Sequence, residues 1–267
     1  MTTFEKIKIL VRQPLAVIIS GIFVQNEKLL GESIEKKYKI NKLPTIDITE
    51  LFPDLEEEVT TYSYLEGTSL VTDIVLLKKF ARRFPACNYL EIGSWRGESL
   101  KNVSEVAAHC TSITLSPEEM TSMNISKDFI ATHGFFSKNI KNVTKILHNS
   151  FTFDFNQLNQ KFDLIFIDAD HSYEGILNDT KKTFNLRKDS SSIIVWHDYG
   201  NSPEKFRNTT LKAILDGVPV EYHKNLYHVS NTLCAVYIEN SKLPNYQTNF
   251  PAIPSKNFSL KVSAQKL

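Results

Sequence analysis

Two short polar clusters in the chain have side chains suited to binding a cation or moving a proton. The first is Asp168-Ala169-Asp170-His171, and the second is His197-Asp198-Tyr199. Carboxylates are the ligands that a hard divalent cation prefers, and an imidazole titrates close to neutral pH. These residue types indicate chemistry at a hydroxyl group or a metal ion, provided that the fold brings the two clusters together.

Each cluster follows an apolar run with the length of a buried strand, residues 162–167 and 192–196. A third run, 87–92, carries Glu91 near its end and leads into a turn punctuated by Gly93 and Gly97. The carboxyl ends of parallel strands lie along one edge of a sheet, where ligands bind in open α/β folds. The acids are therefore expected at that edge, although Asp168 and Asp198 could also be simple helix caps.

The rest of the chain alternates strand-like and helix-like segments over about 150 residues. This pattern predicts an α/β fold: a doubly wound, Rossmann-like, mostly parallel seven-stranded sheet with helices on both faces and an antiparallel last strand. His223 and His228 have no informative spacing and are expected at the surface. The remaining expected helices are 69–84, 98–109, 117–132 and 173–186, and the remaining strands are 112–115, 143–147, 218–222 and 232–238.

Three regions are expected along the chain: an N-terminal helical segment and linker at 1–66, the main domain at 67–240, and an extended tail at 241–267. The apolar run 15–24 is about half as long as the roughly 20 residues that cross a bilayer, so no membrane span is expected. It predicts a helix that packs on the domain or on a second subunit, which suggests a homodimer. A helix lying on a membrane surface remains the alternative.

The overall charge is nearly balanced, with 31 lysines and arginines against 30 acids. Such a chain has no basic field for nucleic acid, and a small-molecule partner fits better. The three cysteines include no Cys-x-x-Cys pair, which argues against a disulfide framework and favours a cytoplasmic location.

The turn Glu91-Ile-Gly-Ser-Trp-Arg-Gly97 resembles the first motif of class I S-adenosylmethionine-dependent methyltransferases. It lacks the middle glycine of dinucleotide-binding turns. Segments 162–179 and 194–199 are similar to the small-molecule and sugar O-methyltransferase subgroup. The resemblance implies S-adenosylmethionine as cofactor, held by Glu91, Gly93, Ser94, Trp95, Gly97, Ser116, Ser150, Asp168 and Asp170.

In the metal-dependent branch of this subgroup, acids after the fourth and fifth strands hold a divalent cation such as Mg. The matching positions here are Asp168, Asp198 and Tyr199, and His171 stands where a general base is expected. The resemblance thus implies Asp168, His171 and Asp198 as catalytic residues. Without the cation the two carboxylates would repel each other, so one is expected to have a raised pKa.

Two residues depart from the family pattern. Tyr199 replaces a better metal ligand, and Ser116 replaces the usual acid at the ribose, where Glu118 is the nearest substitute. The leading hypothesis is methylation of a small hydroxylated molecule such as a sugar or natural product. A non-catalytic cofactor-binding domain is the first alternative. The second is a metal-dependent hydroxylase or hydrolase using Asp168, Asp170, His171 and His197.

Overall fold

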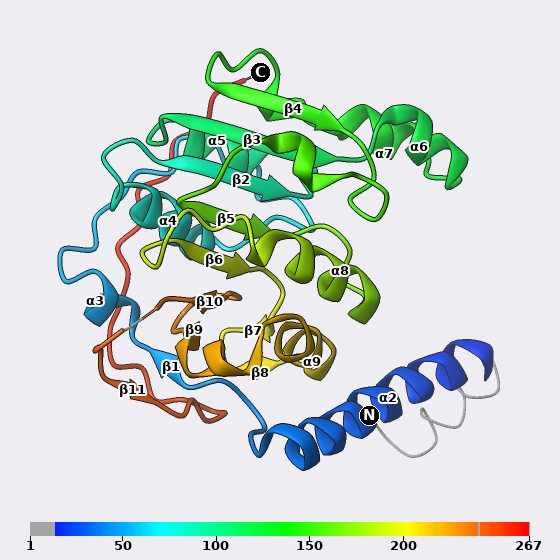
Figure 1. The fold of residues 1–267 in the computed structure, drawn as a ribbon, viewed down its shortest axis with the longest axis vertical. Coiled ribbons are helices and arrows are strands. Elements are labelled where there is room, and N and C mark those ends of the chain that lie inside the picture. Colours follow the sequence, from blue (N-terminus) through cyan, green and yellow to red (C-terminus); the bar gives the residue numbers. More distant parts are fainter. Residues whose placement is uncertain (1–13, 240, 267) are drawn as a thin grey trace.

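The computed structural model describes residues 14–239 and 241–266 (Figure 1). The first 13 residues of the expected N-terminal segment lie outside the described residues. Two layers of helices enclose a single large sheet, and a small two-stranded ribbon, β7 (Gly200–Ser202) and β8 (Lys205–Phe206), lies beside it. The α/β architecture expected from the alternating pattern is confirmed.

The sheet has nine strands in the order β11-β1-β9-β10-β6-β5-β2-β3-β4. The five from β6 to β4 are parallel, and β10 is antiparallel to both of its neighbours, as expected for the last strand. The strands are β1 (Thr45–Ile46), β2 (Asn88–Ile92), β3 (His109–Thr114), β4 (Val143–Leu147), β5 (Leu164–Ile167), β6 (Ile193–Trp196), β9 (Leu226–Val229), β10 (Ala235–Tyr237) and β11 (Asn245–Tyr246).

The expected number of seven strands is wrong, because segments from both ends of the chain extend the sheet. β1 comes from the expected linker and pairs in parallel with β9, and β11 comes from the expected tail and pairs with β1. The predicted strand at 218–222 is also wrong. Pro219 begins a 3₁₀ helix there, Val220–Asn225, and the strand follows as β9. The fully buried His228 lies inside that strand and not at the surface.

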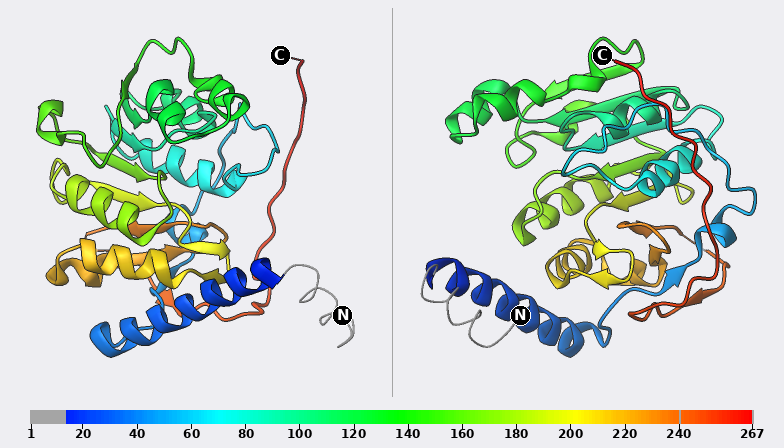
Figure 2. Two further views of the ribbon diagram at one scale, coloured as in Figure 1. Left: turned by 90° about the vertical axis from the view of Figure 1, so that its right-hand side faces the viewer. Right: turned by 180° about the vertical axis from the view of Figure 1, so that it is seen from behind.

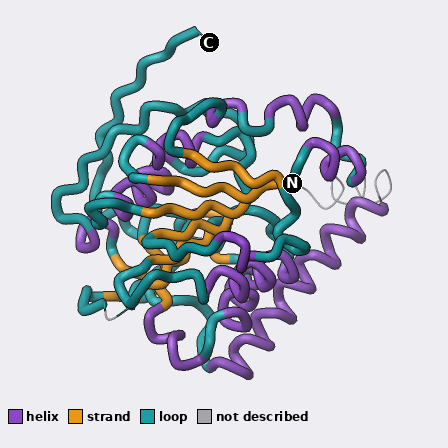
Figure 3. The backbone as a smooth tube through the Cα atoms, turned by 45° about the horizontal axis from the view of Figure 1, so that its top comes forward, coloured by secondary structure: helices purple, strands orange, loops and turns teal. Residues whose placement is uncertain are grey.

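Helices lie on both faces of the sheet (Figures 2 and 3). Successive side chains of the central strands pack into two separate cores, one on each face. Ile165 and Ile167 face the core under α8 (Tyr173–Phe184) and α9 (Asn208–Gly217). Leu164 and Phe166 face the core under α4 (Val71–Ala81) and α5 (Glu98–Ser104). This alternation is the physical basis of the doubly wound arrangement, since both faces of a parallel sheet must be buried.

The expected helix at 117–132 is two shorter helices, α6 (Pro117–Ser122) and α7 (Lys127–Thr132). Asn124 adopts a left-handed conformation with φ of 59°, which ends the first helix. Ser126 then caps the second helix by accepting a hydrogen bond from the backbone N–H of Phe129. A short helix, α3 (Ile48–Leu51), and two 3₁₀ turns, Phe135–Ser137 and Phe155–Leu158, complete the described elements.

The expected N-terminal helix is α2 (Pro14–Tyr38), which packs along α9 and projects beyond it (Figure 1). Glu27 accepts hydrogen bonds from the backbone N–H groups of Asn208 at 2.7 Å and Thr209 at 3.1 Å. A carboxylate of α2 therefore caps the first turn of α9. No helix among the described residues is long and apolar enough to cross a membrane.

Candidate active site at the carboxyl edge of the sheet

β2 ends in a turn whose two glycines have left-handed backbone conformations. The φ angle is +86° at Gly93 and +84° at Gly97. A Cβ atom at Gly93 would lie 2.4 Å from the carbonyl oxygen of Asp168 and 2.4 Å from Cα of Ala169. Glycine is therefore required at residue 93 by the close contact between the ends of β2 and β5. Any side chain there would clash with the backbone even when no ligand is bound.

Glu91 is fully buried beneath this turn. Its carboxylate accepts hydrogen bonds from the hydroxyl of Tyr89 at 2.6 Å and from Ser99 Oγ at 3.0 Å. Burial raises the pKa of Glu91 to about 7, against the lowering effect of these hydrogen bonds. Both carboxylate oxygens are thus engaged with the protein, so Glu91 acts here by holding the turn.

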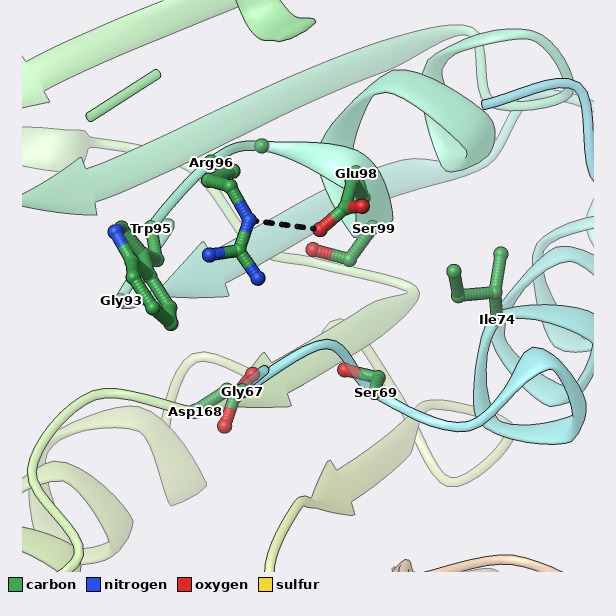
Figure 4. Close-up of a pocket in the computed structure, with 10 residues that line it drawn as sticks. Gly67, Ser69, Ile74, Gly93, Trp95, Arg96, Glu98, Ser99 and Asp168 are labelled. Atoms are coloured by element: carbon green, nitrogen blue, oxygen red, sulfur yellow. Dashed lines mark ion pairs between the residues drawn. The ribbon is translucent and has the colours of Figure 1, made fainter. Parts of the chain in front are cut away.

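A small cavity of about 30 Å³ lies in front of the turn, with room for little more than water (Figure 4). In the view of Figure 4, Gly93, Trp95 and Arg96 lie on one side of the cavity, and Asp168 and the segment that contains Gly67 lie on the other. Segment 62–70, called the cover segment below, therefore lies over the predicted cofactor site.

Two buried polar atoms at the turn have no hydrogen-bond partner, Oγ of Ser94 and Nε of Arg96. The guanidinium of Arg96 also lies over the ring of Trp95, at 3.9 Å from its centroid, and Nε is 3.6 Å from a carboxylate oxygen of Glu98. A buried donor that lacks a partner indicates a place for an acceptor group. The residues present therefore fit a ligand that carries a carboxylate, such as an amino acid.

The ends of β3 and β4 are connected by an acid that the sequence reasoning missed. Glu119 accepts hydrogen bonds from the backbone N–H groups of Ser116 at 2.9 Å and Asn149 at 3.0 Å. Ser116 in turn caps α6 through its hydroxyl. Ser116 and Glu119 have the Ser-x-x-Glu spacing of a capping box, a pattern that could have identified Glu119 from the sequence. Glu119 is therefore the acid that follows β3. Glu118, the expected substitute, is exposed.

Two further predicted cofactor residues lie at the start and side of α8. Asp170 accepts hydrogen bonds from the backbone N–H and hydroxyl of Ser172, at 3.0 Å and 2.6 Å, and so shapes the turn into the helix. The carbonyl oxygen of Ser150 accepts a hydrogen bond from Nζ of Lys182 at 2.7 Å. Both residues are anchored by local contacts, and neither lines the cavity at the glycine turn.

The fold brings the two polar clusters together as a ring of alternating acids and imidazoles. Nε2 of His171 lies 3.0 Å from Asp198 and 3.6 Å from Asp168. Nδ1 of His197 lies 3.2 Å from Asp168 and 3.5 Å from Asp198. Asp198 adopts a left-handed backbone conformation, with φ of 54°, an uncommon state that aspartate tolerates better than most residues. Of these carboxylates, Asp168 also lines the cavity at the turn.

The imidazoles determine how this ring titrates. The pKa values of Asp168 and Asp198 are both lowered, because interactions with His197 and His171 outweigh the cost of burial. The expectation of one raised carboxyl pKa is therefore wrong for the metal-free protein. Hydrogen bonds to the two acids raise the pKa of His171 to about 10. His171 is protonated at neutral pH in this state and cannot accept a proton until another cation engages the acids.

Tyr199 does not fit its predicted role as a metal ligand. Its ring is fully buried and stacks on Phe206, with centroids 4.8 Å apart. Its hydroxyl accepts a hydrogen bond from the backbone N–H of Leu43 at 2.9 Å. The left-handed turn at Asp198 thus directs the following side chain into the core, and His197 supplies the third group beside the acid pair.

Residues 90–199 match the model of a family described as a methyltransferase domain. A comparison with curated proteins gave no match. Similar solved structures include an O-methyltransferase from Bacillus cereus in complex with SAH, 11% identical over 81% of this chain and 100% of that chain, with a TM-score of 0.45. An O-methyltransferase of tomaymycin synthesis from Streptomyces achromogenes is 13% identical over 65% of this chain and 82% of that chain, with a TM-score of 0.44.

Proposed function

We propose that the methyltransferase domain at residues 90–199 transfers the methyl group of S-adenosylmethionine to a hydroxyl group of a small molecule, such as a sugar or natural product. We also propose that a divalent cation bound at Asp168 and Asp198 assists the transfer. The proposal rests on the family match together with one geometric observation. Asp168 belongs both to the cavity at the glycine turn and to the ring of acids and imidazoles.

Because Asp168 belongs to both places, the cofactor and the methyl acceptor would lie next to each other beside this residue. A cofactor with its amino-acid end near Ser94 and Arg96 would have its reactive end near Asp168. S-adenosylmethionine supplies an activated methyl group on a sulfonium. The protein then needs mainly to hold the acceptor oxygen in line with the methyl carbon, because alignment alone removes much of the barrier to such a transfer.

His171 is the group best placed to receive the hydroxyl proton. Its side chain is about half exposed, and its Nε2 faces Asp198 and Asp168. A bound divalent cation would neutralise the two carboxylates and lower the pKa of the acceptor hydroxyl. His171, freed from both acids, can then accept the proton as the oxygen–carbon bond forms and the carbon–sulfur bond breaks. The demethylated product would be S-adenosylhomocysteine, and His171 would release the proton to solvent.

The test combines binding with turnover. Calorimetry should detect binding of S-adenosylmethionine and S-adenosylhomocysteine to the purified protein. Labelled cofactor should then transfer its methyl group to members of a panel of sugars and phenols, and excess chelator should suppress this transfer. Failure to bind either form of the cofactor would contradict the proposal as a whole. Full transfer in excess chelator would remove only the cation.

A non-catalytic cofactor-binding domain is the second candidate, and the two departures from the family pattern, Ser116 and the fully buried Tyr199, favour it. Binding without transfer to any acceptor would support that alternative. A hydroxylase or hydrolase using the acids and imidazoles would instead require iron or zinc in the purified protein, which elemental analysis measures directly.

A further inference from the structure

His197 has one ring nitrogen engaged by a buried carboxylate and the other aimed at the acid pair. Nε2 lies 3.1 Å from Oδ2 of Asp73. Nδ1 lies 3.2 Å from Asp168 and 3.5 Å from Asp198, yet the structure gives it no hydrogen-bond partner. The side chain is only 8% exposed. A buried nitrogen without a partner beside two carboxylates provides the donor set of a divalent cation.

Asp73 is held rigidly at the start of α4 and has no exposed surface. One carboxylate oxygen accepts from the backbone N–H of Leu70 at 2.8 Å, and the other accepts from the backbone N–H of Leu233 at 2.8 Å. The thiol of Cys234 is a further donor at 3.6 Å. Every neighbour of the carboxylate is a donor, so the carboxylate is an acceptor only. The proton that lies between the two side chains is therefore bonded to Nε2 of His197, which donates it to Asp73.

This arrangement determines what His197 can offer to the acid pair. A cation that binds at the acid pair takes the place of the Nδ1 proton of His197, and because the other proton is fixed on Nε2, the Nδ1 lone pair is the one offered to the cation. Nδ1 is the nitrogen that faces Asp168 and Asp198. A carboxylate that fixes the tautomer of a histidine in this way is typical of the outer shell of metal sites.

We propose that Asp73 is a positioning residue that holds His197 as a nitrogen ligand, so that the site binds a divalent cation through Asp168, Asp198 and His197. This inference rests on the cation half of the proposed function. It changes the expected metal, because the sequence suggested magnesium on oxygen ligands alone. An imidazole ligand shifts preference toward cobalt, zinc or iron, whereas magnesium prefers oxygen.

The test measures metal binding without cofactor or substrate. Calorimetry gives the affinities of the intact protein for Co²⁺ and Mg²⁺, and the visible spectrum of bound Co²⁺ reports on nitrogen ligation. Three variants are compared. Asp73→Asn places an amide beside Nε2, His197→Asn replaces the ring nitrogen by an amide oxygen, and Thr72→Val is the control. Thr72 also ties α4 to the 230–234 turn, through a 2.6 Å hydrogen bond to the carbonyl oxygen of Asn231, and is not hydrogen-bonded to His197.

Asp73→Asn is expected to weaken Co²⁺ binding by about 10-fold to 100-fold, the usual effect of removing such an outer partner. Mg²⁺ affinity should change much less, and Thr72→Val should alter neither. His197→Asn should lower the ratio of Co²⁺ affinity to Mg²⁺ affinity by about tenfold or more, and it should shift the visible spectrum of bound Co²⁺. If Asp73→Asn does not fold, as judged by thermal unfolding of the metal-free protein, His197→Asn decides alone.

Three results would overturn the inference. The first is an unchanged affinity ratio and an unchanged Co²⁺ spectrum in His197→Asn. The second is an unchanged Co²⁺ affinity in a folded Asp73→Asn variant. The third is the absence of Co²⁺ binding to the unaltered protein. If the same preparation still binds the cofactor and transfers methyl groups, the metal-site inference is wrong but the proposed methyl transfer stands.

Discussion

Arg96 donates a hydrogen bond from its guanidinium to the carbonyl oxygen of Glu66 at 2.7 Å, which fastens the cover segment over the glycine turn. A second hydrogen bond reaches Thr68 Oγ1 at 3.1 Å, and the ring of Trp95 packs against Gly67. These contacts leave a cavity with room for little more than water. A cofactor the size of S-adenosylmethionine does not fit this cavity, so we predict that its binding moves the cover segment away from the turn.

We predict that Arg96→Gln weakens binding of S-adenosylhomocysteine by about tenfold or more, which corresponds to about 1.4 kcal/mol. The guanidinium is expected to exchange the carbonyl oxygen of Glu66 for the cofactor carboxylate, a stronger charge-assisted partner. Calorimetry measures the affinity, and hydrogen exchange of backbone amides 63–69 reports the opening. Arg82→Gln, which removes the ion pair between an exposed arginine and the buried carboxylate of Glu57, serves as control. Unchanged affinity in Arg96→Gln would contradict this role.

Gly93→Ala should destabilise the protein even without a ligand. The added Cβ would lie 2.4 Å from backbone atoms of residues 168 and 169, at a φ that side chains rarely adopt. Left-handed strain alone costs about 1–2 kcal/mol, and the backbone contact adds to it. Urea unfolding of the free protein measures the effect. Unaltered stability with lost cofactor binding would instead mean that Gly93 matters only to the ligand.

Asp198→Asn should reduce turnover by about 100-fold or more and change cofactor affinity little. The carboxylate faces His171 and His197, so its loss removes acid–base and cation contacts on the acceptor side. Asparagine tolerates the left-handed backbone at this position and is therefore a better probe than alanine. Initial rates at saturating cofactor, with a separate binding measurement, distinguish the two effects. Equal losses in turnover and cofactor affinity would argue against this placement.

The sequence predicted the central sheet well, because β5 and β6 are continuous apolar runs that are fully buried. The expected strand 143–147 coincides with β4, and the expected helix at 173–186 differs from α8 only at its end. The resemblance to methyltransferases is confirmed over residues 90–199. The edge strands were missed because β1 and β11 are two residues long and have no alternating pattern of their own. Each of them pairs with a strand that lies far away in the sequence.

The candidate site was predicted in part. Strand ends located Asp168, His171 and Asp198, since their positions follow from the parallel topology alone. Asp73 was not predicted, because nothing along the chain connects the start of α4 with the end of β6. Tyr199 was misassigned because a left-handed residue precedes it and redirects its side chain, and the sequence does not show which aspartate adopts that state. The backbone conformation of Asp198 alone thus determines that the side chain of Tyr199 lies in the core and not at the metal site.

His228 should make the protein sensitive to mild acid. Burial lowers its pKa to about 4, and Nε2 contacts the carbonyl oxygen of Thr232 at 3.1 Å. The unfolded chain binds this proton more readily, so stability is complete above about pH 6.5 and falls as pH decreases toward 4. The loss is on the order of 3 kcal/mol at most, at about 1.4 kcal/mol for each pKa unit.

His228→Gln tests this assignment, because glutamine can keep the hydrogen bond to Thr232 but does not titrate. The variant should lose much of the acid sensitivity between pH 6.5 and 4, as measured by urea unfolding at several pH values. His109→Gln, which changes a histidine that hydrogen-bonds Thr144 at the exposed end of β3, is the matched control. An identical pH dependence in the His228 variant and the unaltered protein would assign the effect to other groups.

The projecting half of α2 should mediate self-association. Leu15, Ile18 and Ile22 are 56–68% exposed, an unusual state for three large apolar side chains on one helix. Deletion of residues 1–40 would be a poor test, because it also removes the Glu27 cap of α9 and the buried Ile34. Deletion of residues 1–24 spares both and should leave a folded core.

Light scattering coupled to size exclusion should find a dimer for the full chain and a monomer for the shortened one. Paired Ile18→Gln and Ile22→Gln changes keep the helix length and should have the same effect, because they remove the apolar face alone. Circular dichroism and thermal unfolding establish that the core is intact. If the full chain is instead monomeric and binds phospholipid vesicles through the same two isoleucines, this face of α2 contacts a membrane surface. That result would contradict the predicted dimer.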